Sequence, residues 1–159
     1  MITGDAPQFD LPALAGGRQS LRDLLTSGPV LLGFFKVSCP TCQLTLPFLE
    51  RLYRGQVADG PQIVGISQDD AAATRDFNRR YGISLPVLLD PPGGVETAHY
   101  PASNAYGITN VPTLFLVEPD GRISLSVTGF DKAEIEKLGV RFGVEVFTAA
   151  DRVPVFQPG

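Results

Sequence analysis

The chain has only two cysteines, and they stand two residues apart in the run Cys39-Pro40-Thr41-Cys42. An apolar run, residues 30–35, comes before them and a helical pattern comes after them. Cysteine thiolates attack disulfides, and a C-x-x-C pair between a strand and a helix is typical of a redox site. We therefore expect Cys39 and Cys42 to carry the chemistry, as a pair that alternates between dithiol and disulfide.

The place of each cysteine predicts its role. Cys39 precedes the first turn of the expected helix, where unpaired backbone N–H groups and the positive end of the helix dipole stabilise a thiolate. We expect Cys39 to be the exposed nucleophile. Cys42 follows about one turn later and is expected to be more buried and to resolve the mixed disulfide. Pro40 suits the first turn because its missing N–H is not needed there, and Pro40 and Thr41 help to set the reduction potential.

Other uses of the two cysteines remain open from the residues alone. They could form a static local disulfide. A closed zinc site needs about four ligands, but the chain adds only one histidine, His99. We therefore expect no metal and no cofactor besides the redox disulfide. Soft thiolates also suit Cu(I), so a copper-binding module is the alternative from another functional class.

Strands and helices alternate along the chain. Apolar runs predict strands at residues 30–35, 63–66, 86–89, 113–117 and 123–127, with a short edge strand near Phe9. Capping residues and apolar spacing predict helices at residues 21–25, 40–58, 70–81 and 132–142, the third capped by Asp69 or Asp70. This order predicts an α/β fold with a mixed sheet.

Length and composition limit the architecture and the partners. The 159 residues fit one domain, with residues 1–20 as an extension and residues 144–159 as an extended tail. The net charge of −4 and the lack of a basic cluster argue against nucleic acid. We expect a monomer without a membrane span. The first residues lack a secretory signal, which indicates a cytoplasmic chain, or a periplasmic one if a signal was trimmed.

Four motifs together resemble the thioredoxin-like superfamily, and most closely its TlpA and ResA type of thiol–disulfide oxidoreductase, which merges into the peroxiredoxin-like branch. They are the C-x-x-C pair after an apolar strand, Pro47 in the following helix, the run Val111-Pro112-Thr113, and the opening run from Gly4 to Leu11. The resemblance covers about residues 4–143. It implies a mixed central β-sheet flanked by helices on both faces.

The resemblance also implies a second wall of the active site. In this superfamily a cis-proline, here Pro112, lies opposite the cysteines. Backbone groups of Val111 could then pair with an extended substrate segment, with Thr113 beside it. The implied partners are protein or small-molecule thiols and disulfides, together with a donor or acceptor of electrons.

This sequence departs from the family pattern at two positions. Gly33 stands where the superfamily often has a buried Asp, so a proton acceptor for Cys42 has to come from elsewhere or from water. Ser38 stands where the family often has tryptophan. Lys36 precedes Cys39 by three residues and is either a solvated lysine or a charge that favours the thiolate.

A peroxiredoxin-like thiol peroxidase is the nearest enzymatic alternative. Peroxiredoxins place Thr or Ser three residues before the peroxidatic cysteine. Here that position holds Lys36 for Cys39, and Cys39 itself for Cys42. Neither alignment keeps the motif, so the sequence favours disulfide exchange over peroxide reduction.

Overall fold

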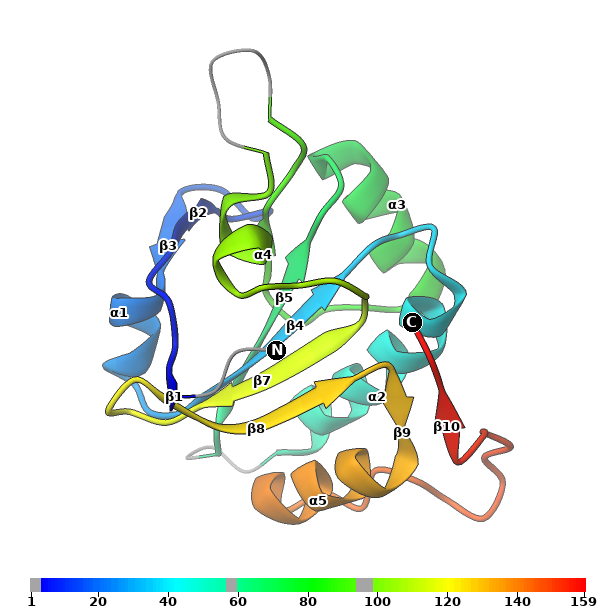
Figure 1. Cartoon of the computed structure of the whole chain (residues 1–159). Helices are drawn as coiled ribbons and strands as arrows, with labels where there is room; N and C mark the ends of the chain where they lie inside the picture. Colours follow the sequence, from blue (N-terminus) through cyan, green and yellow to red (C-terminus); the bar gives the residue numbers. More distant parts are fainter. Residues whose placement is uncertain (1–3, 57–59, 94–98) are drawn as a thin grey trace.

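A central six-stranded sheet organises the molecule (Figure 1). The computed structural model describes residues 4–56, 60–93 and 99–159. The strand order is β1-β8-β7-β4-β5-β6. The strands are β4 (Val30–Phe35), β5 (Gln62–Ser67), β6 (Val87–Leu89), β7 (Thr113–Val117), β8 (Arg122–Thr128) and β1 (Gly4–Asp5).

The sheet is mixed, as expected. Strand β4 pairs in parallel with β5 and antiparallel with β7, and β7 and β8 form the expected hairpin. All six residues of β4 are buried. Its side chains point alternately to the two faces, so the strand that leads to the cysteines is covered on both sides.

Helices cover both faces of the sheet, which confirms the expected thioredoxin-like architecture. Apolar side chains of α2 (Pro40–Gly55), α3 (Ala71–Tyr81) and α5 (Lys132–Phe142) share one core with Leu31 and Phe35. On the other face, α1 (Leu21–Leu25) and α4 (Pro101–Ala105) pack with Val30, Leu32 and Phe34.

Capping residues fix where the helices begin and end. The side chains of Ser20, Asp70 and Asp131 each accept a hydrogen bond from a backbone N–H in the first turn of their helix. Asp70 is therefore the cap of α3, and Asp69 is free for another role. Gly82 ends α3 with a φ of 68°, in the left-handed region that favours glycine.

Several expected elements have different bounds in the structure. Helix α2 ends at Gly55, and the end expected near residue 58 lies outside the described residues. The segment near Phe9 does not form an edge of the main sheet. Instead, β2 (Asp10–Pro12) pairs with β3 (Arg18–Ser20) in a separate two-stranded sheet.

The tail forms a further strand that the sequence pattern did not predict. Residues of β10 (Phe156–Gln157) pair antiparallel with β9 (Phe130–Asp131), which directly follows β8. Figure 1 shows β10 running beside β9 toward the start of α2. Among the described residues, no helix has the length and apolar character needed to cross a membrane.

Candidate active site

Cys39 lies where β4 turns into α2, and its sulfur is held by two backbone groups. It is the N-cap residue of α2, and its Sγ accepts a hydrogen bond of 3.3 Å from the backbone N–H of Cys42. The same Sγ donates to the carbonyl oxygen of Val111, also at 3.3 Å. Cys39 is partly exposed. A thiolate in this place would keep the N–H bond and remain within reach of a substrate.

Cys42 has the opposite environment. Its side chain is fully buried, with 0% exposure, among apolar residues of the core that include Leu46 and Phe130. This burial raises the pKa of the Cys42 thiol far above its ordinary value, and the nearby Cys39 and Asp69 raise it further. The two thiols therefore differ in access, as the sequence predicted, and both are free in this structure.

The Val111–Pro112 peptide bond is cis, which confirms the expected geometry. The Pro112 carbonyl accepts a hydrogen bond of 2.8 Å from the N–H of Gly129, at the end of β8. Thr113 is 4% exposed, and its hydroxyl donates to the carbonyl of Asn110 at 2.7 Å. The side chain of Thr113 thus holds the loop that presents Val111, 3.3 Å from Cys39.

Pro40 and Thr41, the two residues between the cysteines, have different surroundings. Pro40 is exposed, whereas Thr41 is only 4% exposed. The Thr41 hydroxyl donates to the carbonyl of Pro158 at 2.7 Å and accepts from the Gln157 side-chain amide at 2.9 Å. Sequence reasoning missed these tail residues, because no periodic pattern connects them to the C-x-x-C motif.

A side chain at the position of Gly33 would press on two leucines. A β-carbon added there would lie 3.1 Å from Leu49 Cδ1 and 3.4 Å from Leu114 Cδ2. A carboxylate reaches this side of the sheet from Asp69 instead. Its Oδ2 accepts a hydrogen bond of 2.8 Å from the N–H of Val37, in the turn that leads to Cys39. The sequence offered Asp69 only as a candidate helix cap.

Lys36 and Ser38 lie in the turn before Cys39, and His99 contacts Gly93 and Asn104 rather than either cysteine. Lys36 places its Nζ 5.7 Å from the ring centre of Tyr100, and its carbonyl accepts from the Cys39 N–H at 3.3 Å. Ser38 is exposed. His99 is also exposed, and its Nδ1 accepts a hydrogen bond from the N–H of Gly93 at 3.0 Å.

A pocket of about 350 Å³ opens beside the cis-proline loop. Its wall includes Val111, Lys36, Tyr100 and Gly159. Tyr100 has a φ of 44°, the only left-handed value of a non-glycine residue among the described residues. This pocket adjoins Val111, whose carbonyl contacts the Cys39 sulfur.

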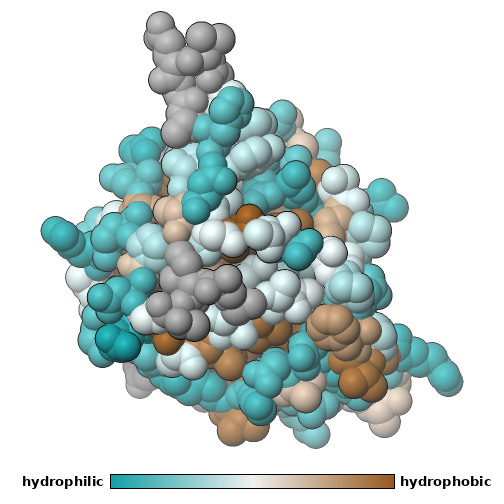
Figure 2. All heavy atoms as spheres, viewed as in Figure 1, coloured by the Kyte–Doolittle hydropathy of each residue, from teal (hydrophilic) through white to brown (hydrophobic). Residues whose placement is uncertain are grey.

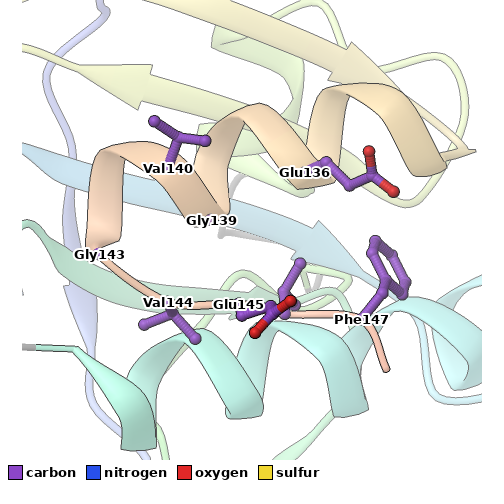
Figure 3. Close-up of a pocket in the computed structure, with 8 residues that line it drawn as sticks. Glu136, Gly139, Val140, Gly143, Val144, Glu145 and Phe147 are labelled. Carbon is purple, nitrogen blue, oxygen red and sulfur yellow. The ribbon is translucent and has the colours of Figure 1, made fainter. Parts of the chain in front are cut away.

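A second pocket lies away from the cysteines. It measures about 430 Å³ and is formed by α5 and the segment that follows Gly143 (Figure 3). Figure 3 shows Glu136 on the helix and Glu145 on that segment. Neither cysteine lines it. Within the described residues, no group of three or more His, Cys, Asp or Glu side chains could hold a metal ion.

Comparison with known proteins agrees with this geometry. Residues 2–126 match the model of the AhpC/TSA family. The chain is 32% identical over 126 residues to the thiol-disulfide oxidoreductase ResA of Bacillus subtilis, covering 79% of this chain and 66% of the relative. The chain therefore spans about two thirds of the length of that curated relative.

Two solved structures from Chlorobium tepidum share the fold. One is described as a DsbE thiol:disulfide interchange protein and has a TM-score of 0.74 at 27% identity, covering 89% of this chain and 95% of the other. The second is a thiol:disulfide interchange protein of the thioredoxin family, with a TM-score of 0.67 at 23% identity over 87% and 97% of the two chains. The second likeness concerns the fold alone.

Proposed function

Since this chain belongs to the AhpC/TSA family, we propose that it is a thiol–disulfide oxidoreductase whose redox pair is Cys39 and Cys42. The observation that carries the proposal is the contrast between a partly exposed Cys39 at a helix N-terminus and a fully buried Cys42 one turn later. The first can meet a substrate, and the second can meet only the first.

The reaction proceeds in two exchanges. The Cys39 thiolate attacks one sulfur of a substrate disulfide, which breaks the S–S bond and forms a mixed disulfide with Cys39. The first substrate sulfur leaves as a thiolate and takes a proton from water. Cys42 then loses its proton and attacks the Cys39 sulfur, so that the second substrate thiol leaves. Two electrons pass to the substrate, and a Cys39–Cys42 disulfide remains.

Backbone groups around the sulfurs support each exchange. The Cys42 N–H stabilises negative charge on the Cys39 sulfur, and the carbonyl of Val111 is close enough to align a substrate chain beside it. Pro40 starts the helix, and Pro112 and Thr113 fix the loop that carries Val111. Asp69 is the carboxylate near Cys42, and it can receive the proton of Cys42 through water.

The physiological partners are a disulfide or thiol substrate and a second thiol couple that restores the starting state. The direction of net electron flow depends on the reduction potential of the pair relative to that couple. Equilibration of the purified protein with glutathione buffers of known ratio measures that potential. A value near that of thioredoxin indicates a reductase, and a much higher value indicates an oxidant.

Trapping of the mixed disulfide tests the assignment of the two cysteines. In Cys42→Ser, Cys39 can attack but the product cannot be resolved, so a stable adduct with a disulfide substrate should accumulate and be visible by mass spectrometry. Cys39→Ser is the matched control and should form no adduct. An adduct on Cys42 in the Cys39→Ser variant would reverse the two roles.

Peroxide consumption separates this activity from that of a thiol peroxidase. We expect disulfide exchange with insulin and negligible steady-state turnover of hydrogen peroxide, because Lys36 stands where a peroxidase would place Thr or Ser. Rapid peroxide turnover that is lost in Cys39→Ser would overturn the proposal. Metal analysis of the reduced protein tests the copper alternative, since one Cu(I) per chain without insulin reduction would favour it.

A further inference from the structure

The last four residues described, 156–159, lie across the two walls of the active site. Thr41, between the cysteines, donates its hydroxyl to the carbonyl of Pro158 at 2.7 Å and accepts from the Gln157 amide at 2.9 Å. Gly159 approaches Val111 so closely that an added β-carbon would collide with the Val111 carbonyl oxygen. One short segment thus contacts both the C-x-x-C motif and the cis-proline loop.

The tail reaches this position by adding a strand. Phe156 and Gln157 pair with Asp131 and Phe130 in an antiparallel ladder, the kind of strand addition by which an extended peptide binds to a sheet edge. The fit is close, because a β-carbon on Gly129 would lie 2.6 Å from the carbonyl oxygen of Gln157. The side chains that face outward remain exposed, at 54% for Phe156 and 78% for Val155. Figure 2 shows hydrophobic side chains gathered over β10.

Contacts earlier in the tail hold it against α2 and the start of α5. Arg51 of α2 makes a two-point ion pair with Asp151, at 2.7 and 3.0 Å, and donates to the carbonyl of Val146 at 3.1 Å. The N–H of Lys132 donates to the carbonyl of Val155 at 3.0 Å. These contacts fix the tail up to residue 155. Residues 156–159 then make the contacts with Thr41 and Val111 that a polypeptide substrate would have to replace.

Part of the site stays open with the tail in place. Cys39 remains partly exposed, and the pocket of about 350 Å³ beside Val111 has Gly159 in its wall. Because the Cys39 side chain is partly exposed, a small disulfide can reach its sulfur without moving the tail. An extended polypeptide that pairs with Val111 and crosses Thr41 needs the space that Pro158 and Gly159 occupy.

We propose that residues 156–159 act as an internal occupant of the polypeptide groove and so determine the substrate class. Small disulfides react with the tail in place, and extended polypeptide disulfides react only after the tail leaves. This inference rests on the proposed function of Cys39 and Cys42. It adds a specificity element that lies outside the matched family region, residues 2–126.

Two variants test the inference by removing or displacing the tail. Deletion of residues 156–159 removes the occupant, and Gly159→Val keeps every tail hydrogen bond donor but adds a side chain that clashes with Val111. Val155→Ala is the matched control, since that side chain is 78% exposed and lies outside residues 156–159. Circular dichroism and thermal unfolding establish that each variant is folded.

The readout is the rate of reduction of insulin relative to that of glutathione disulfide. We expect the deletion to raise the insulin rate by about 10-fold, the factor for the net loss of about one competing hydrogen bond, with Gly159→Val giving a smaller rise. The glutathione disulfide rate should change less than about two-fold. An insulin rate that stays constant or falls in both folded variants would overturn the inference, because the tail would then be neutral or part of the binding surface.

A measurement without disulfide exchange separates this inference from the proposed function. Cys39 can be alkylated either by iodoacetamide or by a maleimide that carries a large polyethylene glycol chain. Deletion of residues 156–159 should speed the bulky reagent more than the small one. If no variant reduces any disulfide, the proposed function fails. The ratio of the two alkylation rates still decides whether the tail restricts access, and an unchanged ratio refutes that.

Discussion

Two ionisable side chains lie at opposite ends of helix α2, the thiol of Cys39 at its start and the carboxylate of Glu50 near its end. Their surroundings differ sharply. Cys39 is partly exposed, and its two hydrogen bonds are both 3.3 Å long. Glu50 is 5% exposed, and its oxygens accept from the N–H groups of Ser84 and Leu85, the Ser84 hydroxyl and Arg54. Both groups anchor a loop to the helix, but only one leaves its reactive atom accessible.

The pKa of Glu50 reflects the hydrogen bonds that its carboxylate accepts. Burial alone would raise the pKa of this carboxyl, but the hydrogen bonds from Ser84, Arg54 and Leu85 outweigh that effect and lower the pKa. The carboxylate is thus charged, buried and fully satisfied, which is the condition for a structural ion. At the other end of the helix, the Cys39 sulfur makes only two long hydrogen bonds and stays accessible. Glu50 uses all its contacts to hold the fold, whereas Cys39 keeps its sulfur partly open to a substrate.

Replacement of the nucleophile should give the largest effect on activity and almost none on stability. We expect Cys39→Ser to reduce insulin turnover to the background rate, because a hydroxyl does not attack a disulfide at neutral pH. Its free energy of unfolding should change by less than about 1 kcal/mol, since the site is partly exposed. Turbidity assays and urea unfolding measure the two quantities. Residual turnover above background would remove Cys39 from its assigned role.

Replacement of the buried carboxylate should give the reverse pattern. Glu50→Ala leaves the N–H groups of Ser84 and Leu85 without acceptors, and we expect it to lower the free energy of unfolding by about 3 kcal/mol. Arg54→Ala is the control. It removes only the outer partner, which is 65% exposed, and should cost less than about 1 kcal/mol. Equal losses in the two variants, measured by urea unfolding, would contradict the structural role of Glu50.

The buried thiol should make the second exchange depend steeply on pH. Because the pKa of Cys42 is raised far above its ordinary value, its thiolate fraction grows about 10-fold for each pH unit between pH 6 and 9. After Cys39 attacks a dithiobis(nitrobenzoate) reagent, release of the second coloured thiolate reports this step in a stopped-flow experiment. A release rate that is flat with pH would mean that loss of the Cys42 proton does not limit resolution.

The ion pair between Arg51 and Asp151, which holds the tail to α2, should contribute less to stability, and its contribution should change only at acidic pH. The Arg51 guanidinium and the N–H of Thr148 lower the pKa of Asp151 to about 2. A lowered pKa in the folded state stabilises the fold above the unfolded value, and this contribution is lost as the pH falls from about 4 to 2. The difference in melting temperature between wild type and Asp151→Asn should therefore shrink over that range. A difference that is constant from pH 5 to 2 would exclude the ion pair as its source.

The sequence predicted the elements whose signals are local. Apolar runs located β4, β5 and β7, and caps such as Ser20 and Asp131 located the helix starts. The resemblance supplied the cis geometry of Pro112, which spacing alone does not predict. These features depend on neighbouring residues or on a motif, so they can be found without the fold.

Features that depend on contacts distant in sequence were not predicted. The hydrogen bond between Thr41 and Pro158 joins residues 117 positions apart, and Glu50 meets Ser84 across 34 positions. Nothing in the local pattern of either segment marks such a contact. The tail pattern predicted only an extended segment for the same reason, because the tail contacts β9, Thr41 and Val111, which are all distant from it in sequence.

The close packing around Gly33 has a consequence for how this protein could evolve. An acid placed under the cysteines at position 33 requires Leu49 and Leu114 to move by a few tenths of an ångström, because their side-chain tips lie 3.1 and 3.4 Å from where a β-carbon would be. A shorter side chain at Leu49 would relieve the tighter of these two contacts, so a chain with that change would accept the acid more easily than this one does.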